Sequence, residues 1–218
     1  WHRCLLDGPR RFYQSDAQYN RHSEQILPFV DTVLKESGLT LKDIDAIAFG
    51  AGPGAFTGLR VACGVAQGLG WASEKPLVAV SNLEAAAIKR AFTGRILVAL
   101  DARMKECYVA TYEVTGGCLS KSLSEPVVAK PEDLGALCEK FEINAVSGDA
   151  FKRYADRIDL TDRVQVLEKT PATALEIAFL AQSMAQEGKT VTALNAAPIY
   201  VRNRVALTID ERAQGVKL

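Results

Sequence analysis

The chain has 218 residues, of which 48% are hydrophobic and 24% are charged, and its 26 basic residues balance its 26 acidic residues. This apolar content excludes disorder as the main state, because such a chain buries enough surface to offset the entropy lost on folding. Zero net charge argues against unaided binding of tRNA or DNA, because contacts to phosphate normally require a basic excess.

The cysteines and the apolar stretches indicate a cytoplasmic protein without membrane contact. No two of the five cysteines have Cys-x-x-Cys spacing, which argues against a disulfide framework and a zinc knuckle. No apolar stretch reaches the roughly 18 residues of a membrane span, and no signal peptide is recognisable. The chain starts at Trp1 rather than at an initiator methionine, which leaves open whether native N-terminal residues are missing.

The beginning of the chain predicts an extended stretch followed by a long helix. Residues 1–6 are apolar and end at the turn signal Asp7-Gly8-Pro9, whereas residues 10–21 predict no element. Apolar residues at three- and four-residue steps predict a helix over residues 23–37. A capping box at residues 40–43 predicts one more helical turn.

A glycine-rich loop joins a strand expected over residues 44–49 to a helix expected over residues 58–72. Small residues follow one another at four-residue intervals in this helix, with Gly64 and Gly68 among them. A glycine inside a helix costs about 1 kcal/mol relative to alanine. We therefore expect a neighbouring element to approach the helix backbone closely at these glycines.

The rest of the chain alternates strands with helices, which indicates the α/β class. Ser81 begins a capping box for a helix expected to reach Phe92. A composition shift then predicts two lobes, residues 1–93 and residues 94–218. Further strands are expected over residues 77–80, 95–100, 107–112, 143–147, 164–167 and 198–201, further helices over residues 131–140 and 173–186, and a loose tail from Arg212.

The loop Gly50–Thr57 is a candidate anion site, because free N–H groups and the helix dipole favour an anion where a helix begins. Its residues Gly50-Ala-Gly-Pro-Gly-Ala55 fit the loose dinucleotide pattern G-x-G-x-x-A. The next strand ends without the acid that would hold a ribose, and the loop lacks the Gly-Lys-Ser/Thr of a Walker motif. The structural interpretation is a tight turn that feeds a closely packed helix.

The titratable residues predict neither a catalytic set nor a metal site. His2 and His22 are the only histidines, and neither stands near a cysteine or a pair of acids at ligand spacing. Asp101, Arg103 and Glu106 cluster at the junction of two strands, where carboxylates can serve as acid and base. We favour ion pairs that hold a turn between the lobes. The sequence therefore predicts no catalytic, metal or cofactor-binding residue.

Three segments resemble the bacterial TsaB (YeaZ) family: Gly52–Arg60, Asp101–Tyr108 and Pro198–Asn203. The resemblance covers nearly the whole chain and implies the two-lobed α/β fold of actin, Hsp70 and sugar kinases (ASKHA), shared by the wider glycoprotease-like family. Family members begin with one more strand, so the first strand of that fold is expected to be missing from this chain. The signature residues of the loop are Gly52, Pro53, Gly54, Thr57, Gly58 and Arg60.

The resemblance also implies a function in making N6-threonylcarbamoyladenosine (t6A) in tRNA. In that family TsaB is the non-catalytic scaffold and activator of its metal-bearing paralogue TsaD, and the ATPase TsaE joins them. TsaB pairs with itself when alone and meets tRNA only through the complex. TsaD holds its metal with a His-Met-Glu-Gly-His run, where this chain reads Asn82-Leu-Glu-Ala-Ala86. The resemblance thus implies no chemistry and no cofactor of its own.

The family pairs through helices of the N-terminal lobe, which we transfer to residues 23–37 and 58–72. Periodicity alone leaves open whether the faces of these helices belong to the core or to an interface between subunits. Two other functions also stay open: a nucleotide- or dinucleotide-dependent enzyme that uses Gly50–Ala55, and a metallopeptidase, suggested only by kinship. The expected partner interface consists of Leu27, Val30, Val33, Leu34, Val61, Val65 and Leu69.

Overall fold

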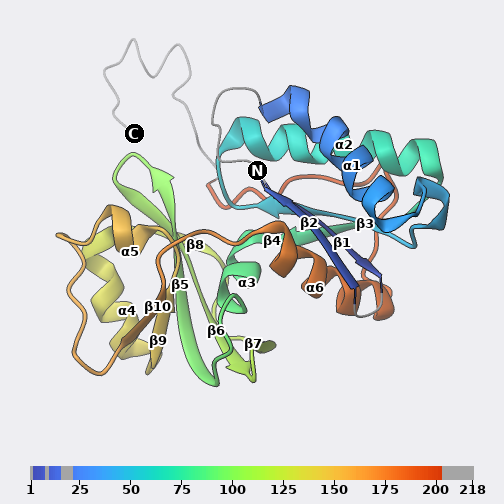
Figure 1. Cartoon of the computed structure of the whole chain (residues 1–218). Helices are drawn as coiled ribbons and strands as arrows, with labels where there is room; N and C mark the ends of the chain where they lie inside the picture. Colours follow the sequence, from blue (N-terminus) through green and yellow to red (C-terminus); the bar gives the residue numbers. More distant parts are fainter. Residues whose placement is uncertain (1, 8–9, 16–21, 203–218) are drawn as a thin grey trace, which may run out of the picture.

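The computed structural model describes residues 2–7, 10–15 and 22–202 and shows two groups of elements side by side (Figure 1). Trp1, the tail expected from Arg212, and the side chains of His2 and His22 lie outside the described part. Within that part, no helix combines the length and the apolar character that crossing a membrane requires.

The first group contains two separate pairs of strands. β1 (His2–Asp7) and β2 (Arg10–Ser15) form an antiparallel hairpin, whereas β3 (Ile47–Gly52) and β4 (Leu77–Ser81) form a parallel pair. β2 lies where the sequence predicts no element. Its Arg10 and Arg11 are exposed, and such a polar strand lacks the apolar alternation by which strands are recognised.

Helices cover both faces of these strands. α1 (His22–Ser37) and α2 (Phe56–Ser73) lie on one side, and α6 (Ala174–Gln186) lies on the other (Figure 1). The side chains of Phe49, Cys63 and Leu77 are buried between α2 and the strands. On the other side, Val80 and Ile177 share a core cluster, so α6 returns to pack on the first half of the chain. The expected boundary between residues 93 and 94 separates the strands of the first group from the six-stranded sheet. The helix α6 comes after this boundary in the sequence but packs on the first group.

The second group is a six-stranded mixed sheet. Its order is β10-β9-β5-β6-β7, with β8 on a free part of β6; the β5–β6 pair is antiparallel and β9 is parallel to β5 and β10. The sequence does not predict β7, β8 or α5, all of which are short. The elements are β5 (Gly94–Arg103), β6 (Glu106–Thr115), β7 (Cys118–Ser122), β8 (Val127–Ala129), β9 (Ala145–Ser147), β10 (Gln165–Glu168), α4 (Leu134–Lys140) and α5 (Ala150–Arg153), with 3-10 turns at Leu41–Asp43 and Pro131–Asp133.

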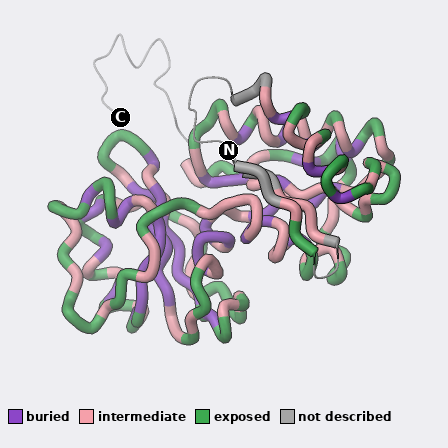
Figure 2. Tube along the Cα trace, in the orientation of Figure 1, coloured by how far each residue is buried: buried purple, intermediate pink, exposed green. Residues whose placement is uncertain are grey.

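The six-stranded sheet holds the most completely buried part of the chain (Figure 2). On one face, Leu134 of α4 and Phe151 of α5 pack against Leu97 and Val109. On the other face, Leu83 of α3 (Asn82–Ala87) packs against the strands. The sheet is therefore covered by α4 and α5 on one face and by α3 on the other. The helix α3 also connects the sheet to the first group of elements.

Two expected elements differ from the observed ones. α3 ends at Ala87 rather than at Phe92. The side chain of Phe92 packs against the six-stranded sheet, and its carbonyl oxygen accepts a hydrogen bond from Gly117, so the chain leaves the helix. Residues 198–201 form no strand, because only the N–H of Ile199 pairs with a strand, donating to Ala51 at 2.8 Å.

Within the described part of the chain, no element packs closely at Gly64 or Gly68, contrary to the expectation. A Cβ built at either glycine meets no atom within 4 Å, and both residues are exposed. The closely packed glycine of α2 is Gly70, whose added Cβ would lie 2.7 Å from the side chain of Leu77. The helix therefore has an inner glycine that packs on the strands and two outer glycines in open space.

Candidate functional site

A cleft of about 470 Å³ lies between the two groups of elements. The loop after β3 contributes Pro53 and Gly54, and α3 contributes its first residue, Asn82. The end of β5 contributes Asp101, and the C-terminal segment contributes residues 199–202. The cleft thus brings together the three segments on which the family resemblance depends.

Glycines let the signature loop pack without side-chain bulk. Gly52 has φ +128°, and a Cβ there would lie 2.6 Å from the carbonyl oxygen of Ile199. A Cβ at Gly50 would lie 2.5 Å from Oδ1 of Asn82. The Nδ2 of Asn82 donates a hydrogen bond to the carbonyl oxygen of Pro53 at 3.0 Å. The loop is therefore held from both sides, which agrees with the tight-turn interpretation.

The exposed end of the signature loop contacts the C-terminal segment. The guanidinium of Arg60 lies 3.8 Å from the centre of the Phe56 ring, a cation–π contact. Its Nε donates to the hydroxyl of Tyr200 at 3.3 Å, and the rings of Phe56 and Tyr200 lie 5.9 Å apart. Thr57 is exposed and Gly58 is half-buried. Arg60 thus ties the start of α2 to a segment far along the chain.

Asp101 is the centre of a charged network at the end of β5. Its Oδ1 accepts hydrogen bonds from the hydroxyl of Tyr154 at 2.6 Å and from the N–H of Arg103 at 3.0 Å. Its Oδ2 lies 3.1 Å from Nε of Arg153. The N–H of Asp101 donates to Asp149, whose pKa is raised mainly by burial. With these partners Asp101 holds the backbone around it.

Glu106 belongs to a different pair. Its Oε2 lies 2.5 Å from the guanidinium of Arg202, which also reaches the carbonyl oxygen of Ala102. The side chain of Arg202 is only 14% exposed. The three residues expected to cluster, Asp101, Arg103 and Glu106, therefore divide into two ion-pair groups. Arg202 is separated from Glu106 by 96 positions, so no local signal in the sequence pairs them.

The residues at the start of α3 are largely packed in the core. Leu83 and Ala85 are 0% exposed and Ala86 is 1% exposed. Glu84 is partly buried, and burial raises the pKa of its carboxyl, while Lys189 partly opposes the shift. Among the described residues, no three His, Cys, Asp or Glu side chains gather as metal ligands would.

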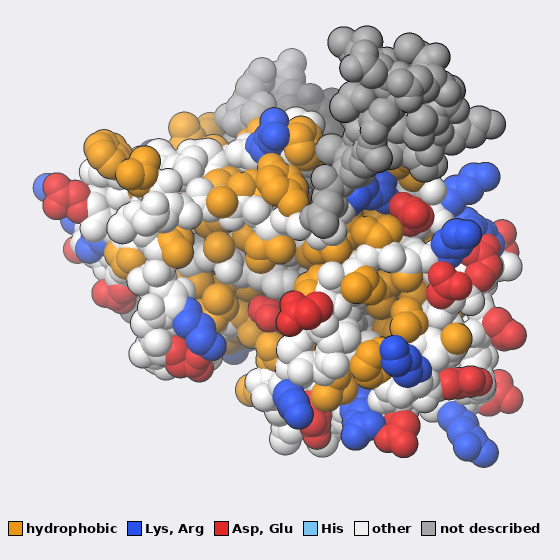
Figure 3. Space-filling view, turned by 180° about the vertical axis from the view of Figure 1, so that it is seen from behind, with side chains coloured by type: hydrophobic (Ala, Val, Ile, Leu, Met, Phe, Trp, Pro, Cys, Tyr) orange, Lys and Arg blue, Asp and Glu red, His pale blue; other side chains and the backbone are white. Residues whose placement is uncertain are grey.

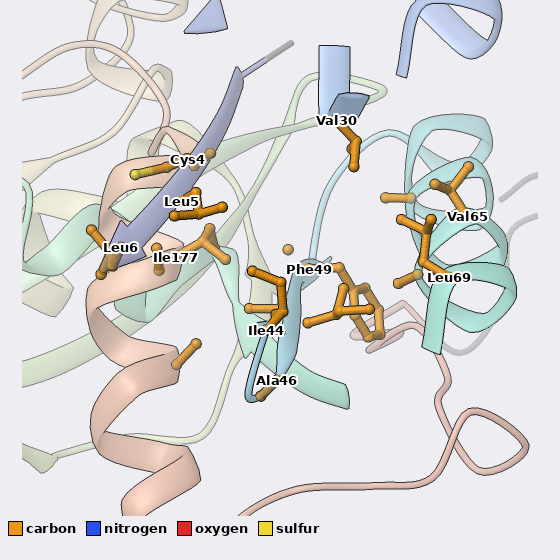
Figure 4. A pocket seen from close by; sticks show the side chains of 18 of the residues that line it. Cys4, Leu5, Leu6, Val30, Ile44, Ala46, Phe49, Val65, Leu69 and Ile177 are labelled. Atoms are coloured by element: carbon orange, nitrogen blue, oxygen red, sulfur yellow. The ribbon is translucent and has the colours of Figure 1, made fainter. Parts of the chain in front are cut away.

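The residues expected at the partner interface lie on two sides of the helices. Five of them line a cavity of about 1070 Å³ beneath the helices: Val30, Val33, Leu34, Val65 and Leu69 (Figure 4). Val33 is only 4% exposed, so its side chain is inside the chain. Leu27 is 55% exposed on α1, and Val61 of α2 is half-buried outside the cavity.

Comparison with known proteins places this geometry in a family. The model of the TsaD family, described as tRNA N6-adenosine threonylcarbamoyltransferase, matches residues 16–211. The tRNA threonylcarbamoyladenosine biosynthesis protein TsaB of Escherichia coli K12 is 36% identical over 194 residues, which is 85% of this chain and 82% of that protein. The chain belongs to the TsaB (YeaZ) family.

Other relatives agree with this family assignment. TsaB of Haemophilus influenzae is 34% identical over 214 residues, covering 93% of this chain and 89% of that protein. The solved structure of YeaZ from Pseudomonas aeruginosa superposes with a TM-score of 0.80 at 32% identity, over 90% of this chain and 92% of that one. A second structure from that organism is described as similar to peptidase YeaZ. It superposes with a TM-score of 0.81 at 32% identity, over 91% of this chain and 93% of that one. The expected TsaB (YeaZ) resemblance and fold class are confirmed.

Proposed function

We propose that this chain is a non-catalytic scaffold subunit in the synthesis of t6A in tRNA. It pairs with a TsaD-like catalytic subunit, acts with a TsaE-like ATPase and forms a homodimer when alone. It works in the cytoplasm and meets tRNA only through the complex, in keeping with its zero net charge. Relatives named for t6A biosynthesis and an open helix face on α2 support this proposal.

The outer face of α2 suits a closely packed partner helix. Gly64 and Gly68 stand one turn apart with open space above them, so another backbone can approach there without meeting side chains. Trp71 follows on the same face with 75% of its surface exposed, and Leu27 of α1 is 55% exposed. Large aromatic side chains often carry much of the energy of an interface. Docking here buries apolar groups that the monomer leaves in water.

Hydrophobic side chains also form patches among uncharged groups across the middle of the back of the molecule, and many of the charged groups stand toward its edges (Figure 3). Association driven by such surfaces depends on burial of apolar area and only weakly on salt. For pairing between the proposed subunits we therefore expect an affinity that changes little with ionic strength.

The proposed lack of chemistry rests on the start of α3. The family resemblance relates residues 82–86 to the metal-binding run of TsaD, where Asn82 and Ala86 occupy the two histidine positions. Ala86 is 1% exposed, and the carbonyl oxygen of Ala86 accepts a hydrogen bond from Ser147. Asn82 holds the signature loop. Both residues thus have structural roles where the paralogue binds metal.

The interface is tested by adding bulk at one open glycine. Gly68→Leu places a side chain in free space, so the monomer should keep its fold while the partner helix is pushed away. We expect at least about a tenfold loss of affinity for a TsaD-like protein in co-purification and calorimetry, which corresponds to about 1.4 kcal/mol. Ser183→Leu, at an exposed position on α6, is the control. A Gly68→Leu variant that binds the TsaD-like protein with wild-type affinity would contradict the proposed interface on α2.

The scaffold role itself is tested with a t6A modification assay. The TsaD-like and TsaE-like proteins should modify tRNA only when this chain is added, and the purified chain alone should show no turnover. A thermal-shift screen with ATP, ADP, NAD and NADP addresses the nucleotide-dependent alternative. A large saturable shift in the isolated chain, lost in Gly54→Val, would favour an enzyme over a scaffold.

A further inference from the structure

The last described residues of the chain, residues 199–202, contact both groups of elements. Within the described part, the chain itself passes between the groups twice, through residues 82–93 and through residues 169–173. These two stretches are linked to each other, because Nζ of Lys89 donates a hydrogen bond to the carbonyl oxygen of Pro171 at 2.7 Å. Two units joined in this way are expected to move relative to each other unless further contacts prevent it. Residues 199–202 supply such contacts.

The segment is anchored to the first group partly through its main chain. The N–H of Ile199 donates to the carbonyl oxygen of Ala51 in β3 at 2.8 Å. The carbonyl oxygen of Ile199 packs so closely on Gly52 that a Cβ there would lie 2.6 Å from it. The hydroxyl of Tyr200 accepts a hydrogen bond from Nε of Arg60 at 3.3 Å. Because these contacts include the backbone of a strand, this end of the segment cannot leave without disturbing β3.

The contact with the second group depends on one side chain, that of Arg202. Its guanidinium pairs with Oε2 of Glu106 at 2.5 Å and reaches the carbonyl oxygen of Ala102 at 3.4 Å. Its Nη1 donates to Sδ of Met104 at 2.8 Å. The side chain of Arg202 is 14% exposed and that of Glu106 is 35% exposed. Removing one partner of an ion pair that is shielded from water leaves the other charge uncompensated, so the contact is sensitive to the loss of either residue.

The contacts of Arg202 surround a turn whose backbone is strained. Met104 and Lys105 join β5 to β6, and the φ angles of Arg103, Met104 and Lys105 are +62°, +53° and +61°. This left-handed conformation is costly for residues with a side chain, so two-residue hairpin turns favour Asn and Gly. Arg202 contacts the chain before, within and after the turn. Its contacts therefore offset strain that the turn would otherwise release.

We propose that residues 199–202 are a clasp that holds the two groups of elements in their observed arrangement, and that Arg202 is its release point. When Arg202 leaves Glu106, the turn between β5 and β6 relaxes and the groups rotate about α3, which lies between them (Figure 1). The cleft that residues 199–202 line then widens. Relief of strain partly compensates for the lost contacts, which brings the clasped and released arrangements closer in free energy.

Distances between the two groups test the clasp. Spin labels are attached to cysteines introduced as Ser183→Cys in α6 and Glu139→Cys in α4, two exposed positions on different groups. Cys4→Ser and Cys118→Ser remove the two thiols that are not buried. Dilution with unlabelled protein restricts double electron–electron resonance to distances within one chain. The test uses the isolated chain, and the inference does not depend on the proposed function.

The clasp is broken from either side by one substitution. We expect a single narrow distance with the clasp intact, and a broadened or displaced distribution in Arg202→Gln and in Glu106→Gln. Arg163→Gln makes the same chemical change at an exposed position that does not line the cleft, and it should keep the narrow distance. Circular dichroism identifies the variants that fold, and either clasp variant suffices. Distributions in the clasp variants equal to that of Arg163→Gln would overturn the proposal.

Hydrogen exchange tests the strained turn separately. In Arg202→Gln, the amides of residues 103–106 should exchange at least about tenfold faster than in the unchanged chain. Met104→Asn with Lys105→Gly gives the turn residues that suit a left-handed backbone. Added to Arg202→Gln, this pair should return exchange of the turn to within about twofold of the original rate, while the distance between the groups stays altered. Fast exchange in the combined variant would overturn the strain, and a restored distance would overturn Arg202 as the link between the groups.

Discussion

Nδ2 of Asn82 donates a hydrogen bond to the carbonyl oxygen of Pro53 at 3.0 Å, which fastens the start of α3 to the loop ahead of α2. The two residues are 29 positions apart. The side chain lies so close to Gly50 that a Cβ there would meet Oδ1 at 2.5 Å. A dinucleotide-binding loop would have a ribose-binding acid at about this position. Asn82 stands there instead, and its side chain holds the loop.

Replacing Asn82 by alanine should loosen this loop. The carbonyl oxygen of Pro53 loses its donor, so we expect the free energy of unfolding to fall by about 1 kcal/mol, the usual net worth of such a bond. Chemical denaturation measures the change. Asn82→Asp keeps the size but has no donor when ionised, and it should be no more stable than Asn82→Ala. A Asn82→Asp variant with wild-type stability would show that the bond contributes nothing.

The glycines of α2 should respond in opposite directions to alanine. Gly64→Ala and Gly68→Ala should each raise the free energy of unfolding by up to about 1 kcal/mol, because alanine is the better helix former and no atom lies within 4 Å. Gly70→Ala should lower it, because the new Cβ meets the side chain of Leu77 at 2.7 Å. Urea unfolding of the three variants compares them. If the Gly70→Ala variant were more stable than the Gly68→Ala variant, the close packing of Gly70 against Leu77 would be contradicted.

Glu84 should make the protein less stable as the pH rises. Burial raises the pKa of its carboxyl above the ordinary value of 4.5, with Lys189 partly opposing. The folded chain then holds this proton more tightly than the unfolded chain, so the free energy of unfolding falls as pH increases from the ordinary pKa through the raised one. Glu84→Gln should remove this contribution and be more stable than wild type at neutral pH. The two proteins should converge below pH 4.5, and an unchanged slope in the variant would contradict the shift.

The cysteines should differ strongly in reactivity. Burial raises the pKa of Cys107 to about 12 and that of Cys138 to about 11, whereas Cys118 is exposed. Because the thiolate is the reactive form, Ellman's reagent at mildly alkaline pH should label Cys118 at least about 100-fold faster than the two buried thiols. Cys118→Ser should lose one fast equivalent. Fast labelling of Cys107 in folded protein would show that its surroundings open readily.

Much of the element order was predictable because its signals are local. The helix expected over residues 173–186 is observed as α6, and at its start the carboxylate of Glu176 accepts a hydrogen bond from the N–H of Thr173 at 2.7 Å. The N-cap at Ser81 accepts from the N–H of Glu84. The end of α3 was not predictable, because the hydrogen bond to the carbonyl oxygen of Phe92 comes from Gly117, in the turn between β6 and β7.

The candidate site was predictable only in part. The signature loop was found through its glycines, and Gly52 indeed stands against the backbone of Ile199. No pattern in the sequence marks Arg202, yet it is paired with Glu106 and mostly buried. An arginine carries the same charge in either setting, so only its distant partner reveals the role.

From its sequence alone, this chain was recognisable as an α/β protein of the TsaB family, because caps, periodicities and loop motifs depend on neighbouring residues. Tertiary structure decided which side of α2 faces outward and that Val30 and Val65 line an internal cavity. Periodicity marks the apolar side of a helix but does not say what covers it. That depends on residues brought together from far along the chain.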